Sequence, residues 1–121
     1  MTEIQNTKQY DLEDRTLKFA KDIREFARKV HKDIANFEDL KQLIRSSGSV
    51  GANYIEANEA LSKKDFVMRV KICRKEAKES KYWLRLINVN DNDGLEQERQ
   101  NLENEAKELT HIFGSIITKS K

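Results

Sequence analysis

The 121-residue chain contains no proline and a single cysteine, Cys73. One cysteine excludes a disulfide within the chain and fits a reducing compartment. No apolar run approaches the roughly 18 residues of a membrane helix, and residues 1–8 lack the apolar core of a signal peptide. We therefore expect a cytoplasmic protein that makes no contact with a membrane.

Charged residues are plentiful instead. They make up 36% of the chain against 37% apolar residues, and the mean hydropathy is −0.83. Such a composition, uninterrupted by proline, favours long helices with exposed charged faces over a sheet. The net charge is only +2. The molecule as a whole therefore offers no strong field for nucleic acid, and any such site must come from local segregation of charge.

Apolar residues recur at helical spacing in four segments. The second segment begins near Asn36 as a predicted N-cap, the third at Ser62 with Asp65 three residues later, and the fourth near Leu95 after the turn-forming segment 88–94. The first segment starts at Asp11, and its predicted core residues are Ala20, Ile23, Ala27, Val30 and Ile34, widened by Leu17, Phe19 and Phe26.

These four segments predict an all-α fold, an up-down-up-down antiparallel four-helix bundle. We expect it to form one domain over residues 11–121, preceded by a flexible N-terminal arm of residues 1–10.

The second segment is unusual because residues 46–58 carry few large side chains. Glycine and serine in a helix cost about 0.5–1 kcal/mol each relative to alanine, so close neighbours must compensate. On a helical wheel Ser47 and Gly51 lie on the core side, which suits packing within the bundle. The opposite side is also thin, with Ser46, Ser49, Asn53 and Glu56, and this predicts a second contact there.

The third segment concentrates positive charge. Residues 62–88 hold nine Lys or Arg and three acids, a net charge of +6, so the remainder of the chain carries −4. Most of these cations share one side of the helix, and Tyr82 lies among them, where its ring could stack on a base. The stripe is compatible with nucleic-acid contact and with a simple solvated face. Its cations are Lys64, Lys71, Arg74, Lys75, Lys78, Lys81 and Arg85.

A second flank of this helix carries Ile72, Trp83 and Leu86. These residues either widen the core face or form a subunit interface, where tryptophan is enriched. Together with the outward row of the preceding helix (Ser49, Asn53 and Glu56) they favour self-association.

Signals for metals and catalysis are weak. Glu108 and His111 have the Glu-x-x-His spacing of di-iron bundles, but the second such pair is missing, so we predict a solvated pair. The segment 91–94 predicts a turn, because a calcium loop centred on its glycine would lack both end ligands. Cys73 lies in the core register and is predicted to be a packed thiol. We predict no cofactor, metal or catalytic residue.

The chain from Ser46 to Leu84 nevertheless resembles the proteins encoded within intervening sequences of bacterial 23S ribosomal RNA genes. The match includes a serine-rich segment, Asn53, Glu56 and the pair Asp65–Phe66 after Ser62. It departs at Ala57, at Gly51 and at Lys75–Glu76, where the family usually has glycine, proline and a small Gly-Ser pair.

This resemblance implies an antiparallel four-helix bundle that forms homopentamers and has no assigned enzymatic activity. It also implies that Asn53 and Glu56 are structural. A related branch, the accessory proteins of diversity-generating retroelements, binds nucleic acid and a reverse transcriptase through a basic surface.

Three hypotheses follow. The first is a non-enzymatic oligomeric bundle that binds RNA or DNA through the basic stripe. The second is a protein–protein scaffold without nucleic acid. The third is a ribonuclease, because Arg24 and His31 match the Arg-x(4–6)-His spacing of the all-helical HEPN ribonucleases, in which such a pair could stabilise a phosphate and move its proton.

Overall fold

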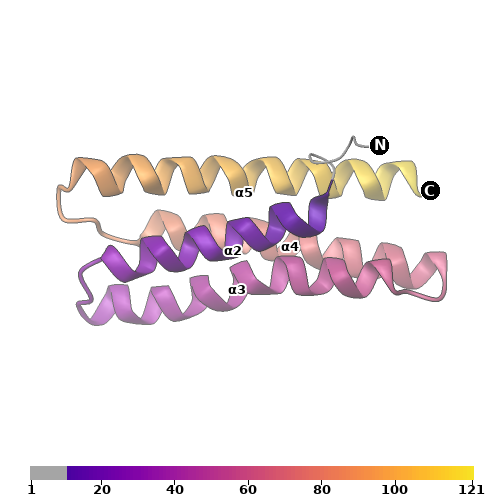
Figure 1. Cartoon of the computed structure of the whole chain (residues 1–121), viewed down its shortest axis with the longest axis horizontal. Coiled ribbons are helices and arrows are strands. Elements are labelled where there is room, and N and C mark those ends of the chain that lie inside the picture. Colours follow the sequence, from indigo (N-terminus) through magenta and orange to yellow (C-terminus); the bar gives the residue numbers. More distant parts are fainter. Residues whose placement is uncertain (1–10) are drawn as a thin grey trace.

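The computed structural model describes residues 11–121, which form four helices in up-down-up-down order (Figure 1). This arrangement confirms the predicted all-α antiparallel bundle. The predicted flexible arm, residues 1–10, lies outside the described residues. The helices are α2 (Leu12–Lys29), α3 (Ile34–Asn58), α4 (Lys63–Leu86) and α5 (Asp93–Lys119).

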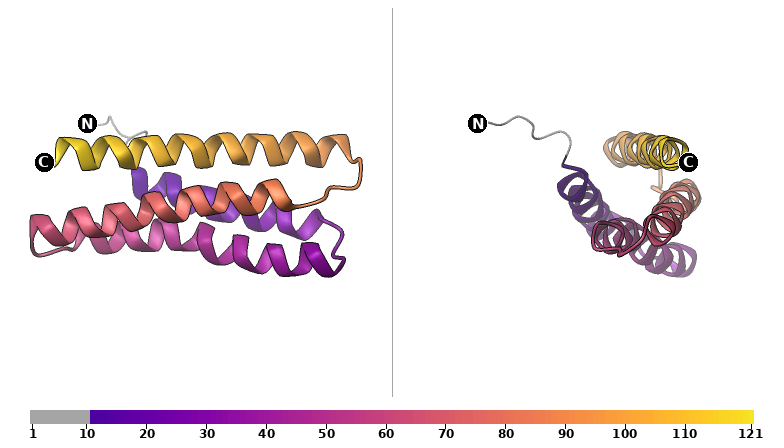
Figure 2. Two further views of the ribbon diagram at one scale, coloured as in Figure 1. Left: turned by 180° about the vertical axis from the view of Figure 1, so that it is seen from behind. Right: turned by 90° about the vertical axis from the view of Figure 1, so that its right-hand side faces the viewer.

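The helices follow one another around the bundle, so that α2 and α4 lie diagonally opposite (Figure 2). The most extensive contacts are those of α4 with α3 and with α5, and the smallest contact is that between α2 and α5. One cause is length, because α2 has 18 residues and α5 has 27. The C-terminal end of α5 therefore extends beyond the first turn of α2 (Figure 1).

Each helix begins at a polar N-cap whose side chain accepts a hydrogen bond from a backbone N–H three residues later. The predicted cap at Ser62 is confirmed, since its hydroxyl accepts from the Asp65 N–H at 3.1 Å. The predicted cap at Asn36 is wrong. Asp33 caps α3, and its carboxylate accepts from the Asn36 N–H at 2.8 Å.

Asn36 instead joins two loops. Its side chain is buried and donates to the carbonyls of His31 (2.8 Å) and Asn88 (2.9 Å). It also accepts a hydrogen bond from the Asn88 N–H at 3.0 Å. The buried amide thereby satisfies backbone groups of both loops at this end of the bundle, which a water-exposed cap could not do.

The core side of α2 is narrower than predicted. Its buried positions step by four and three residues along a heptad seam, which only the buried Ala27 widens. Leu17 lies beside this seam and is 52% exposed, and Ile34 is not in α2 at all but is the exposed first residue of α3. Both predicted core positions are therefore wrong. The seam consists of Leu12, Thr16, Phe19, Ile23, Phe26 and Val30.

The small residues of α3 serve two neighbours within the chain. Towards α2, a Cβ on Gly51 would lie 2.9 Å from the Thr16 hydroxyl. Towards α4, the Ser46 hydroxyl lies 2.8 Å from that of Ser80, and both are fully buried. The prediction that Ser46 faces outward is wrong. Because α3 packs against both α2 and α4, the side that lies opposite to its α2 contacts is covered by α4 at Ser46.

Candidate nucleic-acid interface

The basic stripe predicted on α4 is a real surface feature. Arg74 and Lys81 are partly covered by neighbouring residues, whereas the others project into solvent. Tyr82 is 57% exposed, and its ring packs edge-on against Trp83 with centroids 5.1 Å apart. An exposed tyrosine with one edge supported is suited to stack on a base. The fully exposed cations are Lys64, Lys71, Lys75, Lys78 and Arg85.

The carboxylates of α4 are turned away from this stripe. Glu76 is buried against α3, with an oxygen 3.4 Å from Nη2 of Arg45. The same guanidinium contacts Glu79, which also accepts a hydrogen bond from Nε1 of Trp83 at 2.9 Å. The Trp83 hydrogen bond and the Arg45 contacts hold the pKa of Glu79 below its ordinary value of 4.5. Two of the three acids on α4 are thus neutralised on the α3 side.

The cations of the stripe make no ion pair with a carboxylate of residues 11–121. Cations on other helices do form ion pairs. Nε of Arg15 lies 2.7 Å from a carboxylate oxygen of Glu105, and Nζ of Lys29 lies 3.1 Å from one of Glu98. The outer face of α4 therefore presents uncompensated positive charge along about 30 Å of helix.

The edge of the stripe continues onto α5. Arg74 lines a shallow cavity of about 520 Å³ together with His111 and Lys119 of α5. Hydroxyl side chains share this cavity, and cations beside hydroxyls are the groups that commonly contact phosphate oxygens. This part of the surface could not be predicted from the sequence, because only the packing of α5 against α4 brings residues 110–119 beside Arg74.

The six residues predicted as an interface lie along the outer side of the contact between α3 and α4. The Asn53 amide donates to the Ser49 carbonyl and hydroxyl, each at 2.9 Å, and accepts from Arg69 of α4 at 3.0 Å. Glu56 and Ile72 line one cavity of about 550 Å³. Trp83 is partly buried against the core, and Leu86 is 46% exposed.

The alternative catalytic pairs are not assembled. Arg24 lines a pocket between α2 and α3 and donates to two backbone carbonyls, whereas His31 is exposed in the following loop and does not line that pocket. Glu108 pairs with Arg15 at 2.8 Å, and His111 is exposed.

Two features predicted for the remaining residues are confirmed. Cys73 is fully buried, and burial raises the pKa of its thiol to about 12, so it is a poor nucleophile. The segment around residue 91 is a turn, in which Asn90 and Asp91 adopt positive φ angles of 53° and 61°. Asparagine and aspartate tolerate this conformation better than most side chains.

Within the described part of the chain, no group of three or more His, Cys, Asp or Glu side chains is placed to hold a metal ion. Of the helices in residues 11–121, none combines the length and apolar character needed to cross a bilayer.

These features define a class of protein, an antiparallel four-helix bundle with one strongly basic helix. The sequence model of the 23S rRNA-intervening sequence protein family matches residues 8–115. Because this match covers most of the chain, the protein belongs to that family, and the resemblance noted in the sequence is confirmed.

A solved structure from Bacteroides thetaiotaomicron is also similar. It is described as a protein with unknown function from the S23 ribosomal protein family. It is 29% identical to this chain with a TM-score of 0.71, and the alignment covers 88% of this chain and 97% of that one. No curated protein matches this chain. Neither the family nor the solved structure has a name that specifies a reaction.

Proposed function

We propose that this protein binds RNA or DNA through the outer face of α4. The observation that carries the proposal is the sorting of charge on this helix. Its cations are exposed and without carboxylate partners among residues 11–121, while Glu76 and Glu79 are engaged by Arg45 on the α3 side. A charged face that serves only solubility does not require the carboxylates and the lysines of a helix to lie on different sides.

The expected contacts are to phosphates. Lysine is a flexible point charge that neutralises phosphate without reading a base, so binding is largely independent of sequence. Tyr82 adds a stacking surface, which favours single-stranded segments over a closed duplex. Arg74 and the α5 residues beside it extend the contact at the edge of the stripe.

Charge reversal tests this proposal. The triple variant Lys71→Glu, Lys75→Glu, Lys78→Glu removes three exposed cations, and we expect it to bind a short fluorescent RNA roughly 100-fold more weakly at low salt. The matched control is Lys21→Glu, Lys107→Glu, Lys121→Glu, because these lysines are also exposed and outside the ion pairs of residues 11–121. Both variants have the same net charge. Equal loss in the two variants, or no binding by the parent protein, would refute the proposal.

We also propose that the protein self-associates through the outer side of the α3–α4 contact. The support is a group of apolar side chains that the bundle does not cover there. Met68 and Leu86 are about half exposed, and Ile72 is partly buried. Apolar side chains beside a polar rim are typical of interfaces.

Light scattering of Leu86→Lys tests this association, with Leu17→Lys on α2 as a control of similar exposure. We expect Leu86→Lys to lower the mass in solution and Leu17→Lys to leave it unchanged. The parent mass also tests the homopentamer that the resemblance implies. If the stripe instead served a protein scaffold, its charge reversal would abolish assembly, and the parent protein would bind no nucleic acid.

A further inference from the structure

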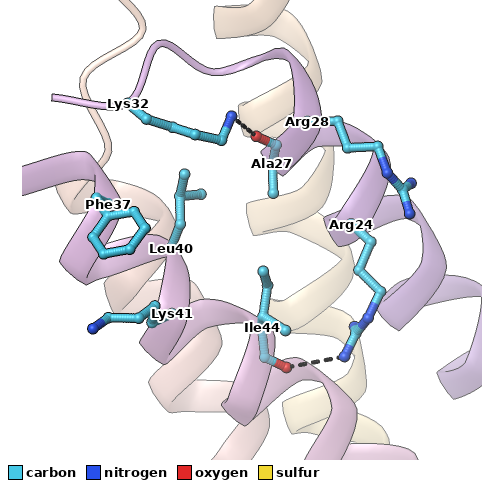
Figure 3. A pocket seen from close by; sticks show the side chains of 8 residues that line it. All are labelled: Arg24, Ala27, Arg28, Lys32, Phe37, Leu40, Lys41 and Ile44. Carbon is cyan, nitrogen blue, oxygen red and sulfur yellow. Dashed lines mark hydrogen bonds between the residues drawn. The ribbon is translucent and has the colours of Figure 1, made fainter.

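A pocket between α2 and α3 lies on the opposite side of the bundle from the outer face of α4. It has a volume of about 240 Å³, and its inner wall consists of Ala27, Leu40 and Ile44 (Figure 3). Phe37 stands at one side and is half exposed. This volume suits a single aromatic ring or a short alkyl chain, because pockets for drug-sized ligands begin at about 300 Å³.

The charged side chains at the edge of this pocket are all cations: Arg24, Arg28, Lys32 and Lys41. Two of them are already compensated. Arg28 pairs with Glu25 at 2.5 Å, and Lys41 pairs with Glu38 at 3.3 Å and extends over the Phe37 ring.

Arg24 and Lys32 are different, because in residues 11–121 both make hydrogen bonds only to neutral backbone carbonyls. Arg24 donates to Ala20 (2.9 Å) and Ile44 (3.4 Å), and Lys32 donates to Ala27 (2.7 Å) and Val30 (2.8 Å). These bonds hold the two side chains at separate edges of the pocket (Figure 3). Within residues 11–121, neither positive charge has a carboxylate partner.

Gly48 explains how the Arg24 guanidinium reaches α3. A Cβ at this position would lie 3.2 Å from Nη2 of Arg24. The glycine thus leaves room for the guanidinium to lie against α3 and reach the Ile44 carbonyl. The cation is held in place before any ligand binds, which reduces the entropy lost on binding.

We propose that this pocket binds a small amphipathic anion. Its apolar body, a ring or a short chain, packs on Ala27, Leu40 and Ile44 beside Phe37, and its carboxylate, sulfonate or phosphate pairs with Arg24 at one edge of the pocket. The site is separate from the nucleic-acid interface on α4, since α2 and α4 are diagonal in the bundle.

The test is a titration followed by 1H–15N NMR of the full chain. The probe is benzenesulfonate, and the matched neutral compound is benzyl alcohol. We expect the sulfonate to shift the amides of Ala27, Phe37, Leu40 and Ile44, and the neutral compound to bind about tenfold more weakly. Octanoate and phenyl phosphate then distinguish an aliphatic carboxylate from an aromatic phosphate as the preferred ligand.

Substitutions of the pocket cations identify the side chain that pairs with the anion. Arg24→Gln is expected to weaken sulfonate binding about tenfold, while Arg24→Lys retains it within about threefold and Lys32→Gln, at the opposite edge, changes it by no more than about twofold. Lys21→Gln, an exposed lysine of the same helix, should have no effect. The proposal is overturned if both compounds bind equally, if the shifts lie on α4, or if Arg24→Gln binds like the parent protein while thermal unfolding shows it folded.

Discussion

Two contacts of the same bundle are built in opposite ways. Where α3 meets α4, the helices approach through small side chains, and the buried hydroxyls of Ser46 and Ser80 lie 2.8 Å apart. Where α2 meets α5, long charged side chains connect the helices, with Arg15 Nε 2.7 Å from Glu105 and Lys29 Nζ 3.1 Å from Glu98. The first contact depends chiefly on shape, with the ion pairs of Arg45 to Glu76 and Glu79 at its edge, and the second depends chiefly on charge.

This difference explains which parts of the chain tolerate change. A close approach of two helices has no room for additional atoms, so its stability is sensitive to volume and insensitive to salt. A contact made by partly exposed ion pairs adapts to substitution and weakens as salt screens the charges. The small residues of α3 thus allow its close contacts with α2 and α4, whereas ion pairs of long side chains connect α2 with α5.

The largest effect is expected from Ser46→Leu, which adds volume at the α3–α4 contact. The leucine cannot fit against Ser80 and also removes the hydroxyl partner, so we expect a loss of about 3 kcal/mol in the free energy of unfolding in urea. Ser115→Leu on the exposed side of α5 is the control, with an expected change within about 0.5 kcal/mol. A small loss for Ser46→Leu would mean that α3 and α4 can separate at little cost.

The two glycines of α3 should respond with opposite signs. Helix propensity alone predicts that alanine stabilises both. At Gly51, however, the new Cβ would meet the Thr16 hydroxyl at 2.9 Å and its Cβ at 3.2 Å, so we expect a loss of about 1–2 kcal/mol. At Gly48 the new Cβ would meet only Nη2 of Arg24 at 3.2 Å, and a shift of this side-chain end by a few tenths of an ångström relieves the contact, so we expect a gain of about 0.5 kcal/mol. Stabilisation by both alanines in thermal unfolding would contradict this description of the α2–α3 contact.

Arg15→Met probes the contact that depends on charge. The pKa of Arg15 is raised, chiefly by its hydrogen bond to Glu105, so the guanidinium is charged at every accessible pH. Because the pair is partly exposed, we expect a loss of only about 0.5–1 kcal/mol at low salt, which shrinks in about 1 M salt. Arg28→Met, which breaks an exposed pair within α2, should cost less. A loss that is independent of salt would indicate a packing role for the Arg15 side chain.

The smallest effect concerns Glu79. Its folded-state pKa lies below 4.5, so it stabilises the protein above that pH, and this contribution disappears as the pH falls through the folded-state pKa. In Trp83→Phe the indole hydrogen bond is absent, and we expect the pKa of Glu79, measured by NMR, to rise towards 4.5. An unchanged pKa would show that Arg45 alone sets the ionisation of this carboxylate.

Much of the fold was predictable because each helix carries its own periodic signal. The helical spacing of apolar residues such as Ile23 and Phe26 and the N-cap at Ser62 each depend only on neighbouring residues, so both can be recognised in the sequence. Errors occurred where a residue had two possible roles. Asn36 could cap a helix, but Asp33 does so, and the amide is used between two distant loops.

The same distinction applies to the surface. The stripe on α4 was predictable, since all its residues belong to one helix. The contribution of Lys119 and the pocket beside Arg24 were not, because both require knowledge of which helices are neighbours. Ser46 was assigned to the wrong side for a related reason, since a wheel drawn for one core direction cannot show a second packing partner.

The most direct test of the central claim is the salt dependence of nucleic-acid binding. If the five exposed cations of α4 contact phosphates, the logarithm of the binding constant for a short single-stranded RNA should fall with the logarithm of salt concentration with a slope of about −3.5. In Lys71→Glu, Lys75→Glu, Lys78→Glu the slope should be shallower by about 2–3, and in the matched control it should be unchanged. Equal slopes in all three proteins would contradict the assignment of the outer face of α4 as a nucleic-acid interface.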